Sequence, residues 1–141
     1  MLGRILALDI GRKRTGVAVT DPLKILANGL TTIPTHTVVD FITDYLTREN
    51  VELLVVGYPL QMNNTPSEAV LYINPVLKQI VKAFPNLPVK QVDERFTSKL
   101  AMQAMIDGGM KKKDRQNKAT VDTISAAIIL QSYLESLSYK H

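Results

Sequence analysis

Residues 4–21 read RILALDIGRKRTGVAVTD, and this stretch sets the architecture of the whole chain. Its first part, 4–11, is an apolar run interrupted by Asp9, which predicts a buried strand. Residues 11–16 (GRKRTG) predict a turn with a glycine at each end, and 17–21 predict a second short strand. Because the turn is short, we expect the two strands to run antiparallel.

The rest of the chain predicts one more antiparallel strand and then alternating helices and strands. Thr37 is the expected N-cap of the first helix, with Asp40 as its capping-box partner, and Pro75 is expected to kink or split the second helix. Right-handed crossovers place the last two strands parallel to the first. The expected strands are 25–33, 52–57 and 89–96, and the expected helices are 38–49, one starting at 65, 97–107 and 119–137. This order predicts an α/β fold with a five-stranded mixed sheet, three antiparallel strands followed by two parallel ones, flanked by helices.

Length and composition narrow the class of protein. A chain of 141 residues predicts a single domain spanning 1–141. The absence of cysteine excludes disulfides and thiolate metal sites. The start has no signal-peptide pattern, and no stretch approaches the roughly 18–20 apolar residues of a membrane span. We therefore expect a cytoplasmic protein without a membrane partner.

Basic residues are gathered in clusters, although the net charge is only +4. Such clusters permit a polyanionic partner, and nucleic-acid phosphates are the expected one. The alternative for the lysine run 111–113 is an ordinary solvated loop. The cations expected to contact nucleic acid are Arg12, Lys13, Arg14, Arg95, Lys111, Lys112, Lys113, Arg115 and Lys118.

Carboxylates follow the buried strands at the points where ligands bind in such sheets. Asp9 ends the first strand, and Asp93 and Glu94 end the last one. Asp122 shares a helical face with Ala126 and Ile129, at i+4 and i+7, so it is expected to point inward. The sequence therefore predicts that these four carboxylates converge at one edge of the sheet.

Converging carboxylates are suited to a divalent cation, which relieves their repulsion. Mg²⁺ or Mn²⁺ takes oxygen ligands, and two such ions about 3.5–4 Å apart activate water against a phosphodiester. Such a mechanism needs no protein nucleophile, which suits a chain with histidine only at His36 and His141. Taken singly, Asp9 could be a turn residue, Asp122 could favour its helix N-terminus, and 93–95 could be a surface charge cluster.

The motifs resemble those of the YqgF family, also called RuvX, described as candidate Holliday junction resolvases. The matching segments are 8–11 (LDIG), 14–19 (RTGVAV), 56–60 (VGYPL), 92–97 (VDERFT), and Lys118 with 121–122 (VD) and 125–127 (SAA). The resemblance implies a ribonuclease H-like fold and a metal-dependent nuclease related to the RuvC resolvases, linked in bacteria to 5′-end maturation of precursor 16S ribosomal RNA. It places the metal ligands on Asp9, on Asp93 or Glu94, and on Asp122, and the related resolvases favour Glu94.

Two other functions are compatible with parts of the sequence. A nucleic-acid-binding adaptor with little activity would retain the basic clusters, but carboxylates beside phosphate weaken binding unless a metal is present. An actin-like or sugar-kinase ATPase module would share the motif at 9–11, yet such proteins need two domains of this kind. The sequence leaves open whether the substrate is structured RNA or branched DNA. Symmetric cutting of a junction would suit a homodimer.

Overall fold

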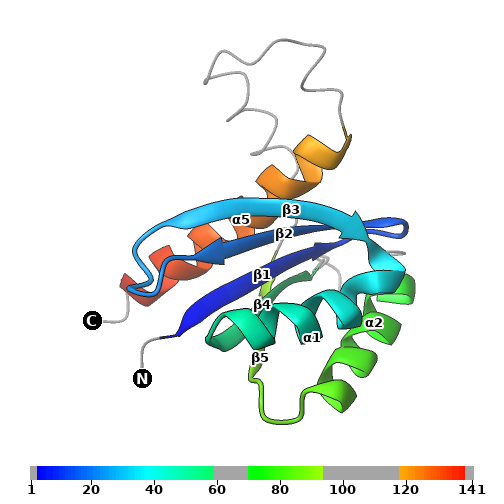
Figure 1. Cartoon of the computed structure of the whole chain (residues 1–141). Helices are drawn as coiled ribbons and strands as arrows, with labels where there is room; N and C mark the ends of the chain where they lie inside the picture. The colour runs from blue at the N-terminus through cyan, green and yellow to red at the C-terminus, as the bar shows by residue number, and fades with distance from the viewer. Residues whose placement is uncertain (1–2, 59–69, 94–117, 139–141) are drawn as a thin grey trace.

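The computed structural model describes residues 3–58, 70–93 and 118–138. Within these ranges the chain forms one five-stranded sheet in the order β3-β2-β1-β4-β5 (Figure 1). The strands are β1 (Arg4–Ile10), β2 (Arg14–Thr20), β3 (Ala27–Pro34), β4 (Val51–Tyr58) and β5 (Val89–Asp93). The helical elements are the short 3-10 turn η1 (Thr35–Thr37), α1 (Val38–Arg48), α2 (Val70–Ala83) and α5 (Lys118–Ser138).

The strand directions confirm the predicted mixed sheet. β1 pairs antiparallel with β2, and β2 pairs antiparallel with β3. β4 runs parallel to β1, and β5 runs parallel to β4. The carboxyl ends of β1, β4 and β5 therefore lie at one edge of the sheet, where the sequence predicts the carboxylates.

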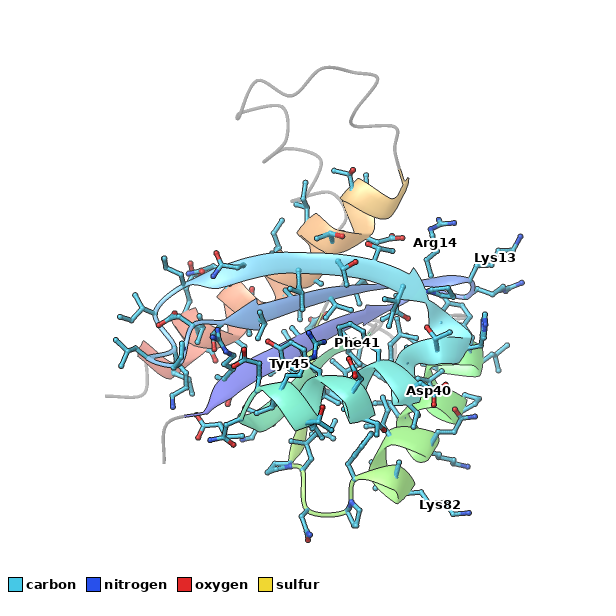
Figure 2. The ribbon with its side chains drawn as sticks, viewed as in Figure 1. Lys13, Arg14, Asp40, Phe41, Tyr45 and Lys82 are labelled. Atoms are coloured by element: carbon cyan, nitrogen blue, oxygen red, sulfur yellow. The ribbon has the colours of Figure 1, made fainter. Side chains whose placement is uncertain are left out.

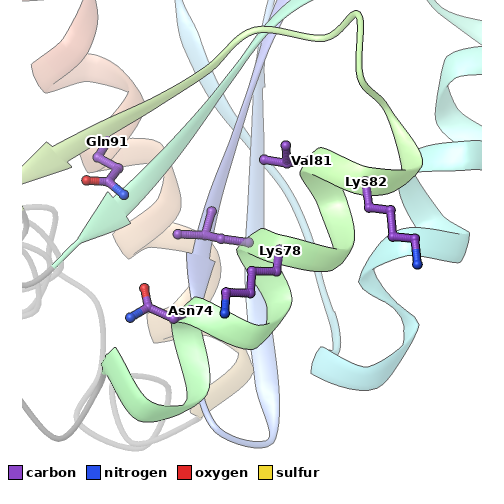
Figure 3. A pocket seen from close by; sticks show the side chains of 6 residues that line it. Asn74, Lys78, Val81, Lys82 and Gln91 are labelled. Carbon is purple, nitrogen blue, oxygen red and sulfur yellow. The ribbon is translucent and has the colours of Figure 1, made fainter.

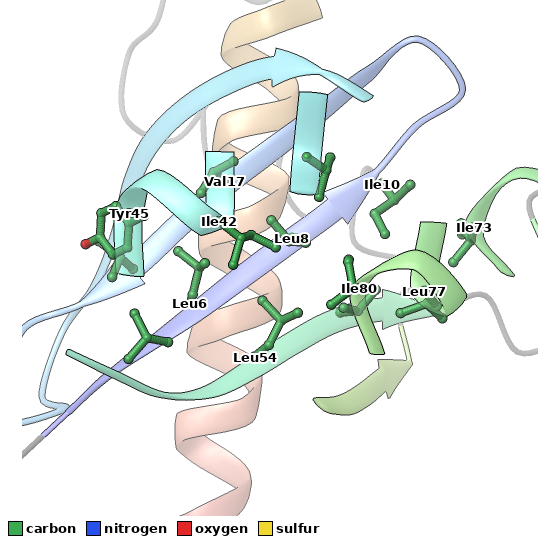
Figure 4. Close-up of a cluster of buried hydrophobic side chains, with 14 residues drawn as sticks. Leu6, Leu8, Ile10, Val17, Ile42, Tyr45, Leu54, Ile73, Leu77 and Ile80 are labelled. Atoms are coloured by element: carbon green, nitrogen blue, oxygen red, sulfur yellow. The ribbon is translucent and has the colours of Figure 1, made fainter. Parts of the chain in front are cut away.

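Helices cover both faces of the sheet. Figure 1 shows α1 and α2 on one face and α5 on the other, and each face has its own buried core. β1 contributes to both, because successive side chains of a strand point to opposite sides. Leu6, Leu8 and Ile10 face α1 and α2 (Figure 4), whereas Ile5 and Ala7 face α5. β4 is buried along Leu54–Gly57, as its continuous apolar run predicts.

The hairpin between β1 and β2 is tighter than the sequence predicts. The expected turn covered 11–16, but β2 already begins at Arg14 and Thr15 pairs with Ile10. The backbone N–H of Gly11 donates to the carbonyl of Arg14 at 2.8 Å, so 11–13 alone make the turn. The paired strands consequently extend to the edge at which Asp9 lies.

Two expectations about helices are corrected. The Thr37 side chain makes no capping bond to α1 and instead donates to the Pro34 carbonyl at 2.7 Å, because Thr37 belongs to η1. Of the two outcomes expected at Pro75, the split is excluded, because α2 is one helix over Val70–Ala83. The buried residues are Val38, Ile42 and Tyr45 in α1 and Ile73, Leu77 and Ile80 in α2.

Several predicted features lie outside the described residues. These are the helix start at 65–69, the end of the last strand at 94–96, the helix at 97–107 and the basic segment 110–117. No helix in the part of the chain that the structure describes is long and apolar enough to cross a membrane.

Candidate active site

Asp9 lies at the carboxyl edge of the sheet, on the face covered by α5. It follows Ala7 in strand alternation, and Ala7 belongs to the core beneath α5, while Leu8 and Ile10 belong to the opposite core. The side chain is only partly buried. Its partner on β2 is Gly16, which places no side chain beside it on this face.

Gly16 is the point at which α5 touches the sheet most closely. A Cβ atom at this position would lie 1.9 Å from the backbone oxygen of Asp122, a distance that no packing tolerates. Glycine therefore allows the first turns of α5 to rest directly on β2. Because Gly16 pairs with Asp9, this contact brings the backbone of Asp122 over the strand neighbour of Asp9.

The rest of α5 holds Asp122 in this orientation. Ala126 and Ile129, which share its helical face, are fully buried against the sheet. The side chain of Asp122 is 26% exposed, so it lies at the rim of that packed face. Asp122 thus lies on the helix face that packs against the sheet, and Asp9 and Asp122 lie on one face of the sheet at one edge.

A cation already accompanies Asp122. The Nε of Arg14 donates to Oδ2 of Asp122 at 3.1 Å and forms an ion pair with it. Arg14 is the first residue of β2, and its side chain remains 40% exposed. Figure 2 shows Arg14 and Lys13 together at the hairpin end of the sheet. The sequence predicted Arg14 as a phosphate contact and did not predict this pairing.

The hairpin that carries the first basic cluster is held by a threonine that the sequence analysis missed. The backbone N–H of Thr35 donates to the Lys13 carbonyl at 2.9 Å, and its hydroxyl donates to the Gly11 carbonyl at 2.7 Å. The same hydroxyl lies 2.9 Å from that of Thr15. These bonds fix the turn that presents Arg12 and Lys13, whose side chains are exposed.

Arg12 extends the basic surface toward α2. Its guanidinium carbon lies 5.6 Å from the centre of the Tyr72 ring, a cation–π distance. Tyr72 is in the first turn of α2, so the hairpin and this helix meet at the carboxyl edge of the sheet. No motif in the sequence connects these two residues, because the contact joins segments sixty residues apart in the chain.

Asp93 does not join Asp9 and Asp122. It pairs with Tyr58, and like Gln91 it lies on the face of α2, where Gln91 lines a groove. Val92 is the residue of β5 that packs on the α5 side. The described geometry thus separates Asp93 from the other two carboxylates.

Of the other predicted site residues, Lys118 lies within the described ranges. Lys118 is the first residue of α5. Glu94, Arg95, Lys111, Lys112, Lys113 and Arg115 lie outside the described residues. Within the described ranges no group of three acidic or histidine side chains forms a complete metal site. Asp9 and Asp122 do supply hard oxygen donors on one partly exposed face, which fits the ligand preference of Mg²⁺ or Mn²⁺.

The arrangement is that of a ribonuclease H-like α/β protein with acidic residues at the carboxyl edge of its sheet. Two structural relatives have this fold: Thermus thermophilus RuvC in complex with a Holliday junction substrate (TM-score 0.58, 16% identity, 96% of each chain covered) and RuvC from the same organism (TM-score 0.56, 14% identity, 96% of each chain covered).

The chain belongs to the RuvX family, whose model is described as Holliday junction resolvase and matches residues 3–136. A relative from Phocaeicola vulgatus, named as a candidate pre-16S rRNA nuclease, is 64% identical over 98% of this chain and 99% of its own length. A Bacteroides fragilis relative with the same name is 58% identical over 96% of this chain and 98% of its own length. The predicted family is confirmed, and with it a hydrolase acting on nucleic-acid phosphodiester bonds.

Proposed function

We propose that this nuclease cuts its substrate with Mg²⁺ or Mn²⁺ held by Asp9, Asp122 and a third carboxylate. The observation that carries the proposal is the contact between Gly16 and the backbone of Asp122, which sets this helix aspartate over the strand neighbour of Asp9. Asp9 comes from a strand and Asp122 from a helix that are far apart in the chain. Partly exposed carboxylates on one face supply the hard oxygen ligands that Mg²⁺ and Mn²⁺ prefer.

We propose Glu94 as the third ligand. Of the two neighbouring residues that the sequence leaves open, Asp93 lies on the opposite face of the sheet from Asp9. The family resemblance favours a glutamate here as well. Glu94→Gln should therefore impair metal binding, whereas Asp93→Asn should leave it nearly unchanged.

Each side chain has a distinct role in this proposal. The carboxylates hold the metal, which when bound would supply an activated water and stabilise the leaving oxygen. Arg12 and Lys13 bind phosphates that flank the cut, since the fixed hairpin presents them at the same edge. Arg95, Lys111, Lys112, Lys113, Arg115 and Lys118 are the other proposed phosphate contacts.

Arg14 is proposed to have two partners in turn. Without metal it neutralises Asp122 through the observed ion pair. A divalent cation at Asp122 would neutralise the carboxylate in place of Arg14 and would repel the guanidinium. The exposed side chain can then turn toward a substrate phosphate, for which the guanidinium fork is well suited.

Precursor 16S ribosomal RNA is the proposed substrate. The curated relatives that support it match almost the full length of this chain at high identity. A four-way DNA junction is the second candidate, because the family model is described by that activity. Cutting both sides of a junction would need two active sites, so this candidate carries the proposal of a homodimer.

A side-by-side cleavage assay tests the proposal. Wild type and Asp9→Asn would be incubated with a ribosomal RNA precursor and with a four-way junction, in EDTA, Mg²⁺ and Mn²⁺. We expect metal-dependent cleavage of the precursor by wild type alone. Binding without cleavage in every buffer would instead indicate a nucleic-acid-binding adaptor.

A further inference from the structure

A groove runs between α2 and the edge strand β5, on the face of the sheet opposite Asp9 and Asp122. It encloses about 490 Å³, and Asn74, Leu77, Lys78, Val81, Lys82 and Gln91 line it (Figure 3). A volume of this size suits one or two small planar groups. The groove is separate from the carboxylates, and nothing in the proposed chemistry uses it.

The wall formed by α2 is basic. Asn74, Lys78 and Lys82 follow one another at four-residue spacing, so they form a row along one side of the helix. The row is about 12 Å long at 1.5 Å per residue. The helix contains no acidic residue, and neither lysine forms an ion pair within the described residues. Asp93, two residues beyond Gln91, is the described acid on this face of β5.

The floor of the groove is apolar, and amide side chains lie on its two walls. Leu77 and Val81 supply an apolar floor, and Val81 is 54% exposed. Asn74 and Gln91 supply amides from opposite walls. The Tyr58 hydroxyl donates to Oδ1 of Asn74 at 3.0 Å, which orients that amide and leaves its nitrogen as the end that can donate to a ligand.

One end of the groove lies beside the carboxyl end of β4. Asn74 lies at the end of the groove that is bonded to Tyr58, the last residue of β4. Tyr72, two residues earlier in α2, lies beneath Arg12 of the hairpin. Arg12 therefore lies beside the first turn of α2, and the lysine row lies farther along the same helix. Figure 2 shows Lys82 at the end of α2 away from the hairpin, so the row leads from the site outward.

We propose that this α2–β5 groove binds an unpaired segment of the nucleic-acid substrate that flanks the cut. Lys78 and Lys82 contact successive phosphates, the floor receives the faces of bases, and the two amides meet base edges. Stacked bases inside a duplex are not accessible to a concave site, whereas unpaired bases can enter one. Lys78 and Lys82 are about 6 Å apart along the helix axis. This inference rests on the proposed function, because it names the part of that substrate that lies beyond the metal site.

Binding measured without metal tests the groove independently of catalysis. Fluorescence anisotropy in EDTA would follow a labelled unstructured oligoribonucleotide and a duplex of equal length. Lys78→Gln should weaken single-strand binding and flatten its log–log salt dependence by about 0.7, and Lys78→Gln/Lys82→Gln by about 1.4. The matched control is Lys90→Gln, an exposed lysine of β5 that pairs with Val55 and lies on the α5 side. Lys90→Gln should change the single-strand affinity and its salt dependence much less.

A second pair of variants tests the floor. Val81→Asp puts a negative charge in the groove at a half-exposed position, where folding is not at risk, and should reduce single-strand affinity at least as much as Lys78→Gln. Val81→Thr keeps the shape and should bind nearly as wild type.

Equal losses of affinity for Lys90→Gln and Lys78→Gln, or an unchanged affinity for Val81→Asp, would overturn the proposal. So would an acidic peptide that displaces the oligonucleotide at lower concentration than unlabelled RNA does. If the binding results are as expected but the wild type shows no metal-dependent cleavage, the proposed function is refuted and the groove proposal is not.

Discussion

The backbone carbonyl of Asp122 lies directly over Gly16, so close that a Cβ on Gly16 would be 1.9 Å from the carbonyl oxygen. This contact fixes the height of α5 above the sheet at the carboxyl edge. It also fixes the distance of Asp122 from Asp9, which pairs with Gly16. A backbone atom, unlike a side-chain end, cannot rotate away, so the approach depends on glycine.

Gly16→Ala should displace the start of α5 and destabilise the fold by about 1–3 kcal/mol, the usual cost of overpacking. It should also weaken metal binding, because Asp122 moves away from Asp9. Chemical denaturation would measure the stability, and calorimetric titration with Mn²⁺ the affinity. Gly29→Ala is the matched control, since its Cβ would meet the side-chain methyl of Thr123 at 2.7 Å and not a backbone atom. If the two variants lost equal stability and metal affinity, the special role of Gly16 would be wrong.

Asp122→Asn should remove most of the thermal stabilisation that Mg²⁺ confers on the wild type. A ligand that binds only the folded state stabilises it by about 2.7 kcal/mol at a hundredfold excess over its Kd. The amide keeps the shape of the side chain but loses the anionic ligand. Melting curves with EDTA and with Mg²⁺ measure the difference, and Asp44→Asn on α1 serves as a control distant from the site. A variant that retains the full Mg²⁺ shift would show that Asp122 is structural.

The sequence predicts the elements of this protein better than it predicts their contacts. Apolar runs and helical stripes are local patterns, so β4 and the buried face of α5 follow from composition and period. The ion pair between Arg14 and Asp122 joins residues 108 positions apart, and no local pattern encodes it. Gly16 was interpreted as a turn residue, because a glycine required by helix packing looks the same in sequence as one required by a turn.

The choice between Asp93 and Glu94 shows the same limit. Adjacent residues of a strand point to opposite faces, so a shift of one residue exchanges their roles. The register of β5 against β4, with Asp93 opposite Tyr58, is needed to assign Asp93 to the α2 face. That register depends on long-range pairing, which the sequence of one strand does not specify.

Asp21→Asn should destabilise the β2–β3 connection at neutral pH. The Asp21 carboxylate accepts backbone N–H bonds from Leu26 at 2.8 Å, Ile25 at 2.9 Å and Leu23 at 3.0 Å. The bond from Leu26 is the main cause that lowers the pKa of Asp21 below its ordinary value of 3.8. These bonds hold a loop whose apolar side chains, Leu23, Ile25 and Leu26, are largely exposed.

The pH dependence of that effect has a definite sign. A carboxyl group with a lowered pKa in the folded state stabilises the fold above its unfolded pKa, and the stabilisation is lost as the pH falls through the folded pKa. The melting temperature of Asp21→Asn should therefore be below that of wild type from about pH 5 to 7, and the gap should close below about pH 3.8. A gap that stayed constant down to about pH 2 would contradict the role of the charge.

Arg14→Gln should increase the affinity for Mg²⁺ or Mn²⁺ while decreasing the affinity for nucleic acid. The guanidinium competes with the metal for Oδ2 of Asp122, and both groups of the pair are partly exposed. Pairs of this kind contribute about 0.2–1 kcal/mol, so their loss should tighten metal binding by about 1.4- to 5-fold. Calorimetric titration of the free protein measures this without any cleavage assay. Arg48→Gln is the control, because Arg48 forms a comparable exposed pair with Asp44 on α1, away from the site. If Arg14 has a purely structural role, Arg14→Gln should lower the melting temperature and leave the metal affinity unchanged or weaker. Tighter metal binding together with weaker binding of RNA in EDTA is expected only if the arginine exchanges Asp122 for a phosphate.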